Sequence, residues 1–259
     1  MRIFSTRCSS TSLVFLVFAV LMVSWGARAE AQVSPLWDHY KVYVQNPPIT
    51  IAPFPVALAD QFGPYTHDVF ALELFANPVE KHLPPPGGEF LINDPLLHYS
   101  WWRISPQPFS AVVTAINQFG DHTLNVHDAE YLLNPALKNQ TGSPPLRNHY
   151  KCYRCDGPPV QRGVFLLDQF DSLFTTVMFP RYFCNPVAKS VPGANYPIVD
   201  LKQHYICYDL QPPDPNPFTA MMTDQFIDNR PLDLHPGIFL CVPTDKTGVT
   251  ATKPSTWGR

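Results

Sequence analysis

A pattern that recurs four times along the chain constrains the fold more than any single residue does. Each copy begins with His-Tyr, continues to Asp-Gln-Phe or Asn-Gln-Phe, and closes on a Pro that is followed three residues later by a Lys. The copies span residues 39–81, 98–138, 149–189 and 204–246. Because such a pattern marks one structural unit used repeatedly, we expect four similar units.

The polar positions that all copies share are candidates for either architecture or chemistry. They are the histidines His39, His98, His149 and His204, the glutamines Gln61, Gln118, Gln169 and Gln225, and the lysines Lys81, Lys138, Lys189 and Lys246. An active site needs its residues once, and Gln and Lys are poor metal ligands. We therefore interpret these residues as repeat-defining structural positions with satisfied hydrogen bonds, and we predict no catalytic, cofactor-binding or metal-binding role for them. For the lysines we expect the stem to cover apolar surface while the charge stays in water, the alternative being a groove for an acidic ligand.

Short runs within each copy have the alternation of β-strands. The fourth position after the His is always aromatic, as Tyr43, Trp102, Tyr153 and Tyr208. The positions two and four before the Asp or Asn are apolar in every copy. Thirty prolines argue against long helices, and the Pro after the third run is expected to end its strand. The sequence predicts an all-β fold with three short strands per copy.

The connections between copies group them in pairs. From the closing Lys to the next His there are 17, 11 and 15 positions in turn, so the middle connection is the shortest. We predict β module 1 over residues 32–140, β module 2 over residues 141–248, each a sandwich or barrel, and a flexible tail over residues 249–259. The alternative is a four-bladed propeller, which needs a fourth strand from each connection.

The cysteines support the alignment of the copies. Cys152 and Cys184 occupy two defined positions of copy three, and Cys207 and Cys241 occupy the same positions of copy four. Copies one and two lack Cys at both positions. Paired presence and paired absence predict the disulfides Cys152–Cys184 and Cys207–Cys241. Cys155 is then a free thiol or forms an intermolecular bridge.

Residues 1–31 have the layout of a signal peptide. Arg2 and Arg7 precede the apolar run 13–23, and small residues follow at Ala29 and Ala31. An uncleaved anchor is the alternative, although the run is short for a membrane span. No second apolar run of membrane length follows, and the net charge of -3 gives no electrostatic basis for binding nucleic acid. We therefore expect a secreted protein, periplasmic or extracellular, with no membrane span after signal removal.

The motifs also resemble an uncharacterised domain family of exported bacterial proteins. The matching segments are 149–154 (His-Tyr-Lys-Cys-Tyr-Arg), 166–170 (Leu-Leu-Asp-Gln-Phe), 183–189 (Phe-Cys-Asn-Pro-Val-Ala-Lys) and 117–120 (Asn-Gln-Phe-Gly). The resemblance covers about His39 to Lys246 and implies a bacterial source and a domain of unknown function. It provides no catalytic residues. Copy one departs from the family pattern because both of its cysteine positions are replaced.

These observations favour a binding or structural role in the bacterial envelope or outside the cell. No hydrolase, nucleotide-binding or zinc-protease motif is present, so we expect no enzymatic activity and no cofactor. The alternative is a hydrolase or metal-binding protein that uses the non-repeated residues Glu73, Glu130, His122 and His127. The expected partner is a protein or a glycan. Trp37, Trp101 and Trp102 are candidate contacts for it where they lie at the surface, and core packing is expected for Trp102.

Overall fold

The computed structural model describes residues 37–85 and 87–251. The predicted signal peptide and residues 252–259 of the predicted tail lie outside the described residues. Residues 249–251 are not a tail, because they form the end of the last strand. No helix in the described part of the chain is long and apolar enough to cross a membrane.

The described residues form an all-β structure, as the sequence predicts. The strands are β1 (His39–Asp60), β2 (Gly63–His82), β3 (Glu89–Phe90), β4 (His98–Ile104), β5 (Ala111–Asn117), β6 (Gly120–Lys138), β7 (His149–Asp156), β8 (Arg162–Leu167), β9 (Ser172–Val191), β10 (Ala194–Tyr196), β11 (His204–Asp214), β12 (Phe218–Thr223) and β13 (Arg230–Ala251). They belong to one sheet.

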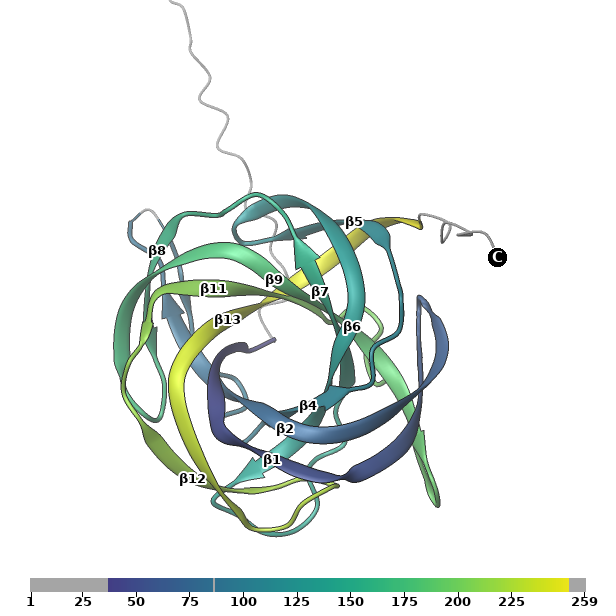
Figure 1. Cartoon of the computed structure of the whole chain (residues 1–259). Coiled ribbons are helices and arrows are strands. Elements are labelled where there is room, and N and C mark those ends of the chain that lie inside the picture. The colour runs from purple at the N-terminus through teal and green to yellow at the C-terminus, as the bar shows by residue number, and fades with distance from the viewer. Residues whose placement is uncertain (1–36, 86, 252–259) are drawn as a thin grey trace, which may run out of the picture.

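Eight of these strands close into a ring, which Figure 1 shows as a barrel seen from one end. The antiparallel order around the ring is β1, β2, β4, β6, β7, β9, β11 and β13, and β13 pairs again with β1. Each copy therefore contributes its first and third runs as neighbouring strands. Closure leaves the inner ring without an unpaired edge, which is the usual solution to the edge-strand problem.

The second run of each copy folds back on the third run and also reaches the copy on the opposite side of the ring. Strand β5 of copy two pairs with β6 and with β13 of copy four, and β12 of copy four pairs with β13 and with β6 of copy two. Likewise β8 of copy three pairs with β2, and the end of β1 pairs with β9. The hairpins thus join copy one to copy three and copy two to copy four.

Neither the two predicted modules nor the propeller is confirmed. Residues 32–140 and 141–248 do not form separate sheets, since one ring uses strands from all four copies. A propeller would need a fourth strand per copy, but among the described residues the connections supply only β3 after copy one and β10 after copy three. In copies two to four the three runs form separate strands, but in copy one the first and second runs form the single strand β1, and the pattern left the strand partners open.

The repeated prolines do not end their strands, contrary to expectation. Pro186 lies inside β9, directly opposite Tyr150, and Cys152 lies opposite Cys184 two residues away. The Cα atoms of that Cys pair are 4.0 Å apart, as in the narrow, non-hydrogen-bonded pairs of an antiparallel ladder. Because pair types alternate, the Tyr150–Pro186 pair is also non-bonded, and the missing proline N–H costs no bond to β7.

The barrel interior is a small aromatic and sulfur-containing core. The tyrosines that follow each repeated His form a closed ring of edge-to-face contacts, with centroid distances of 5.2, 5.5, 5.3 and 5.7 Å in the order Tyr40, Tyr99, Tyr150, Tyr205 and back to Tyr40. The next layer contains Trp101 and both disulfides. The void between these side chains is about 10 Å³, which is about the space that one water needs.

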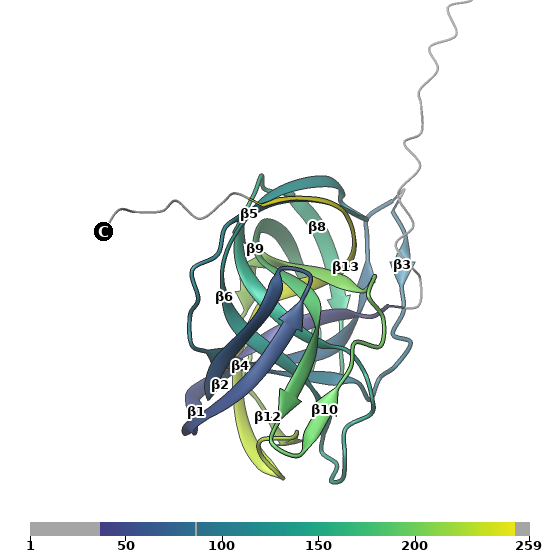
Figure 2. The same ribbon diagram turned by 90° about the vertical axis from the view of Figure 1, so that its right-hand side faces the viewer.

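A second, larger core lies outside the barrel, beneath the hairpins. Apolar residues of the second runs, such as Val56, Leu58, Val164 and Leu166, pack here against the outward side chains of the ring strands. Figure 2 shows the hairpin formed by β1 and β2 crossing the outside of the barrel. Both faces of the ring strands are therefore buried, which explains why they alternate less in hydrophobicity than half-exposed strands.

The connections after copies one and three resemble each other, which gives the ring an approximate twofold symmetry. After copy one, Phe90 of β3 pairs with Lys81, and Asp38 accepts hydrogen bonds from the backbone of Asn93 and Asp94. After copy three, the corresponding interactions are the pairing of Tyr196 with Lys189 and the bonds from the backbone of 199 and 200 to Asn148. The connection after copy two, residues 139–148, contains no such strand.

Candidate functional site

The repeated Asp or Asn joins its own turn to the opposite copy. In each copy the Oδ1 atom of this residue accepts a hydrogen bond from the backbone N–H of the Phe two residues later, at 2.7–2.9 Å. Across the molecule, Tyr43 donates to Asp168 at 2.7 Å, Tyr153 to Asp60 at 2.8 Å, and Trp102 to Asp224 at 2.7 Å, while Asn117 donates to Tyr208 at 2.8 Å. The always-aromatic position and the Asp/Asn position are thus partners between copies one and three and between copies two and four.

The repeated Phe and Lys continue these links between copies. Each Phe packs edge-on against the aromatic residue of the opposite copy, with centroid distances of 5.1–5.5 Å. Each Lys places its Nζ atom near the Phe ring of the next copy, 4.9 Å away for Lys81, 4.4 Å for Lys138, 5.1 Å for Lys189 and 5.6 Å for Lys246. Lys138 and Lys189 also donate to Asn77 and Asn134 of the preceding copies.

The repeated Gln side chains contact the His of the preceding copy. Gln118 bonds His39, Gln225 bonds His149 at 2.9 Å, and Gln61 bonds His204 at 3.0 Å. Gln169 departs from the rule and donates to the carbonyl of Pro95, three residues before His98. The repeat-defining residues therefore lie at the junctions between copies, where an architectural residue is expected.

Burial shifts the ionisation of these residues. Burial together with a nearby Lys lowers the pKa of His98 to about 3 and holds the pKa of His39 and His149 well below the usual range. Burial lowers the pKa of Lys138 to about 8 and that of Lys189 to about 6. The expectation that the lysine charges stay in water is wrong for Lys81 and Lys189, whose side chains are buried.

Both predicted disulfides are present, each linking directly opposed residues of neighbouring ring strands. Cys155 is a free thiol and is completely buried, so in the folded protein it is not exposed for an intermolecular bridge. Burial also raises its pKa, which makes it unreactive. Trp101 and Trp102 are likewise completely buried, so of the three tryptophans considered only Trp37 is partly exposed.

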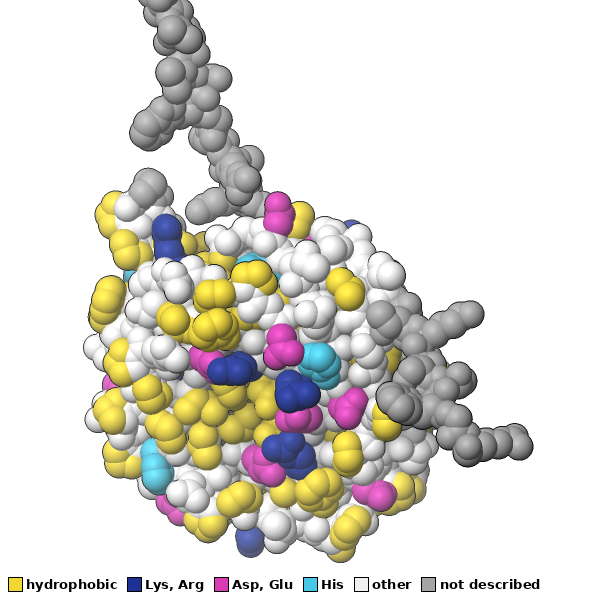
Figure 3. Space-filling view, turned by 45° about the horizontal axis from the view of Figure 1, so that its top comes forward, with side chains coloured by type: hydrophobic (Ala, Val, Ile, Leu, Met, Phe, Trp, Pro, Cys, Tyr) yellow, Lys and Arg dark blue, Asp and Glu magenta, His cyan; other side chains and the backbone are white. Residues whose placement is uncertain are grey.

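The non-repeated candidates do not form a metal site or a pair of free acids. Glu73 and Glu130 both bind Arg103, at 2.9 Å each, and accept further bonds from Tyr131 and Tyr182. The described residues contain no group of three or more His, Cys, Asp and Glu side chains arranged around a metal ion. Figure 3 shows that acidic and basic side chains intermingle on one face instead of forming a patch of one sign.

The two non-repeated histidines lie apart and differ in environment. His122 is buried, with its Nε2 atom 3.0 Å from Asn117 Oδ1 and 3.1 Å from the hydroxyl of Tyr208. It therefore belongs to the network around the single Asn that replaces the repeated Asp. His127 lies nearer the surface and contacts Asp156 at 2.7 Å.

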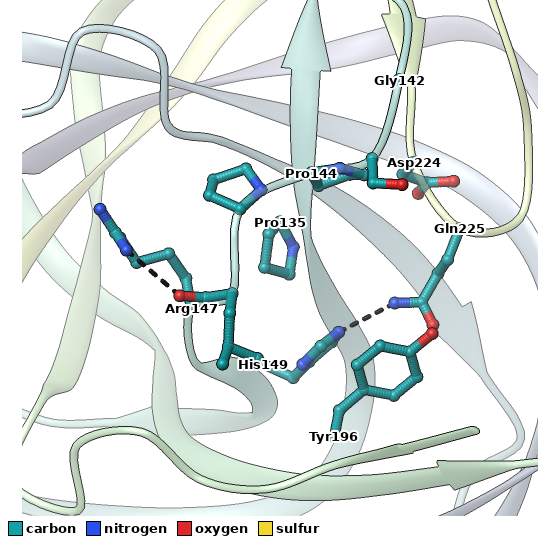
Figure 4. A pocket seen from close by; sticks show the side chains of 11 residues that line it. Pro135, Gly142, Pro144, Arg147, His149, Tyr196, Asp224 and Gln225 are labelled. Atoms are coloured by element: carbon teal, nitrogen blue, oxygen red, sulfur yellow. Dashed lines mark hydrogen bonds between the residues drawn. The ribbon is translucent and has the colours of Figure 1, made fainter.

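A cleft of about 320 Å³ forms where the strandless connection passes over the junction of copies three and four. Its lining includes Pro144 and Arg147 of the connection, together with His149, Tyr196 and Gln225. Figure 4 shows Gln225 and His149 pointing toward each other, with Tyr196 beside them. The Tyr196 ring lies 5.1 Å from the His149 ring. This cleft combines shared residues with residues found once in the chain.

A second, more open hollow of about 530 Å³ adjoins the cleft, because Tyr196 and Gln225 line both. Its other walls are apolar and come from the middle of β1, from the β9–β10 turn and from Phe226. Figure 2 shows β10 and β12 close to the β1–β2 hairpin. The combined space is of the size that small-molecule and oligomer ligands occupy in proteins.

Sequence reasoning identified His149 and Gln225 as structural but did not identify Tyr196. The signal for Tyr196 is its position seven residues after Lys189, where it corresponds to Phe90, nine residues after Lys81. The two connections differ in length, so the repeat alignment, which ends at the Lys, does not bring these aromatic residues into register. Their equivalence appears only when both are seen paired with the repeated Lys.

Comparison with known proteins gives a family and no function. No curated protein and no solved structure matches the chain. The model of a repeat of unknown function, DUF7450, matches residues 98–247, which contain copies two to four. This match covers more than half of the chain, and it agrees with the repeat seen in the sequence and the ring of repeated strands. The chain belongs to the family of this repeat of unknown function, DUF7450.

Proposed function

We propose that this chain is a secreted bacterial binding protein without enzymatic activity, and that its ligand site is the cleft at Tyr196 and Gln225. The barrel and its hairpins serve as a rigid scaffold, since the shared polar residues bind one another across the copy junctions. Two disulfides inside the barrel support an exported location, because such bonds persist in oxidising compartments. The observation that carries the proposal is the cleft itself, which the one strandless connection builds over a repeated junction.

The approximate twofold symmetry supplies a matched control for the cleft. Phe90 packs against His39 with a centroid distance of 5.1 Å, the same distance at which Tyr196 packs against His149. Phe90 pairs with Lys81 as Tyr196 pairs with Lys189, but it is not part of the cleft lining. Replacing either ring by Ala removes similar packing. A difference in ligand affinity between the two variants therefore measures the contribution of the cleft.

The test is a binding screen of the purified mature chain against glycan and peptide libraries. We expect a ligand whose affinity falls at least tenfold in Tyr196→Ala and stays within twofold in Phe90→Ala, with thermal unfolding of both variants compared in parallel. If every ligand found binds Tyr196→Ala as tightly as wild type, the cleft is not the site.

A contact with an envelope component is the second candidate function. Phe165 and Phe174 lie opposite each other on the β8–β9 hairpin and are 40% and 65% exposed, and Leu167 beside them is 40% exposed. The equivalent outward positions of copy one hold Ala57, Thr66 and Ala59. Exposed apolar residues on one copy alone favour a contact made by that hairpin. Phe165→Ser together with Phe174→Ser is expected to release the protein from isolated envelopes without changing ligand binding in the cleft.

A further inference from the structure

We infer that the cleft binds an uncharged, hydroxyl-rich ligand of the oligosaccharide class. This inference rests on the proposed function, because it names the chemistry of the ligand for the same site. It is carried by the charges, the aromatic surface and the unoccupied hydrogen-bonding atoms of the cleft.

The charged side chains that line the cleft are already paired within the protein. Arg147 at its rim already binds Asp94 at 3.0 Å. Asp224 is buried, and its carboxylate accepts bonds from the backbone of Phe226 and Ile227 and from the side chains of Ser100 and Trp102. Burial, together with nearby Lys189, holds the pKa of His149 well below its usual range, which favours the neutral imidazole. A charged ligand would lose hydration here without gaining an ionic partner, whereas a neutral ligand avoids that cost.

The cleft and the adjoining hollow provide an aromatic and apolar floor. Tyr196 lines both spaces and keeps part of its ring exposed. Phe54 and Phe226, 6.0 Å apart between centroids, extend this surface along the hollow. An aromatic ring with a hydroxyl group suits a ligand that has both apolar faces and polar edges, as a sugar ring does.

Hydrogen-bonding atoms remain available around this floor. Gln225 uses its Nε2 atom for His149, which leaves its Oε1 atom as an acceptor with no hydrogen bond among the described residues. The hydroxyls of Tyr196 and Ser143, which also line the cleft, make no hydrogen bond to described residues either. One carbonyl acceptor and two hydroxyls, each able to donate and accept, match the hydroxyl groups of a sugar. The two adjoining spaces favour a chain of several sugar residues over a single one.

The experiment measures the affinity of the mature chain by isothermal titration calorimetry for three kinds of probe. These are neutral hexasaccharides of β-linked glucose and of N-acetylglucosamine, an anionic uronic-acid hexasaccharide, and a proline-rich decapeptide. Each is tested at 50 and 500 mM NaCl with wild type, Tyr196→Ala, Tyr196→Phe and the control Phe90→Ala.

We expect a neutral hexasaccharide to bind with an affinity that changes less than twofold with salt, because no ion pair is involved. Tyr196→Ala should weaken it at least tenfold, and Tyr196→Phe by roughly threefold to tenfold, the effect of losing one neutral hydrogen bond. Phe90→Ala should stay within twofold of wild type.

Two results would overturn the inference in distinguishable ways. If the anionic sugar or the peptide binds with the same dependence on Tyr196 while neutral sugars do not, the ligand class is wrong and the proposed site stands. If no probe binds, or if Tyr196→Ala leaves neutral-sugar binding unchanged, the assignment of an oligosaccharide to this cleft is refuted; in the second case the proposed site falls with it.

Discussion

The buried amino group of Lys189 should impose a measurable pH dependence on folding. Its side chain is 1% exposed, and burial lowers its pKa from the usual 10.5 to about 6, although nearby Asp224 opposes that shift. Between pH 6 and 10.5 the unfolded chain therefore holds a proton on this residue that the folded protein does not. The contribution of Lys189 to the free energy of unfolding therefore rises with pH throughout that window.

The size of the effect follows from counting protons. One extra proton in the unfolded state gives a slope of about 1.4 kcal/mol per pH unit. Between pH 7 and 7.5 Lys189 alone accounts for about one proton, whereas Lys138 and Lys151, whose pKa values are about 8, contribute mainly at higher pH. In the Lys189→Met variant the slope of the free energy of unfolding against pH should therefore be smaller by about 1.4 kcal/mol per pH unit in this interval. Its absolute stability is less informative, because the variant also leaves the buried Asn134 without its Lys donor.

The assay is urea unfolding with the disulfides intact, measured at pH 6.8, 7.2, 7.6 and 8.0 for wild type and Lys189→Met. Lys202→Met is the matched control, because Lys202 is exposed and should leave the slope unchanged. If Lys189→Met keeps the wild-type slope while the m value is constant, Lys189 is charged in the folded protein and the reasoning about its burial is refuted.

The other predictions concern stability at low pH, the hydrogen bonds between opposite copies, the cysteines and the folding of the two halves of the chain when they are expressed separately. The free energy of unfolding should fall as pH drops from 6.5 toward 4. In the folded protein the pKa of His98 is about 3 and that of His204 about 4, so over this range the unfolded chain binds protons on these residues that the folded protein does not. A melting temperature that is constant over this range would contradict the prediction. Asp224→Asn should lower the free energy of unfolding by about 2 kcal/mol, because an amide N–H₂ would face the indole N–H of Trp102, whose remaining contact is Ser100 Oγ at 3.2 Å. Asp168→Asn should cost less, because the Tyr43 hydroxyl can accept a hydrogen bond from the new amide as the Tyr208 hydroxyl does from Asn117. Urea unfolding measures both variants, and a larger loss for Asp168→Asn would be evidence against this role. Intact mass without reductant should show the loss of four hydrogens, and Cys155 should resist alkylation until the protein unfolds; prompt labelling of the native protein would disprove its burial. Residues 32–140 and 141–248 expressed separately should each be unfolded as monomers by circular dichroism and should gain strand structure on mixing, whereas a folded monomeric half would argue against the exchange of hairpins between copies.

The sequence was sufficient to predict the local structure and the disulfides. Alternation around the Asp-Gln-Phe turns reports which residues face inward, and that information is contained within each copy. The paired cysteines carry long-range information as well, because each pair is present or absent together. Both cross-links are therefore found where they were predicted, whereas the strands are longer than predicted, because the repeated prolines lie inside them and β1 contains two runs of copy one.

The sequence was not sufficient to predict which strands lie side by side. Strand periodicity is the same whether a hairpin packs on its neighbour or crosses to the opposite copy, so the pairing of β5 with β13 leaves no local mark. Similarly, Lys189 has the same position in the repeat whether its amino group is hydrated or is enclosed by Tyr196 and Phe226, so the sequence does not distinguish the two cases. The cleft combines the 139–148 connection with Tyr196 and Gln225, which are far apart in the sequence, so the sequence pattern did not predict it.

The approximate twofold relation between copies one and two and copies three and four also bears on how such a barrel can originate. Each half supplies four ring strands in order, and each half provides the hairpins that the other requires. A shorter chain with only two copies therefore has every part needed to complete the same ring by associating with an identical chain. Gene duplication and fusion of such a homodimer would give a single polypeptide free to vary one half, and the cleft at Tyr196 lies where the halves have diverged.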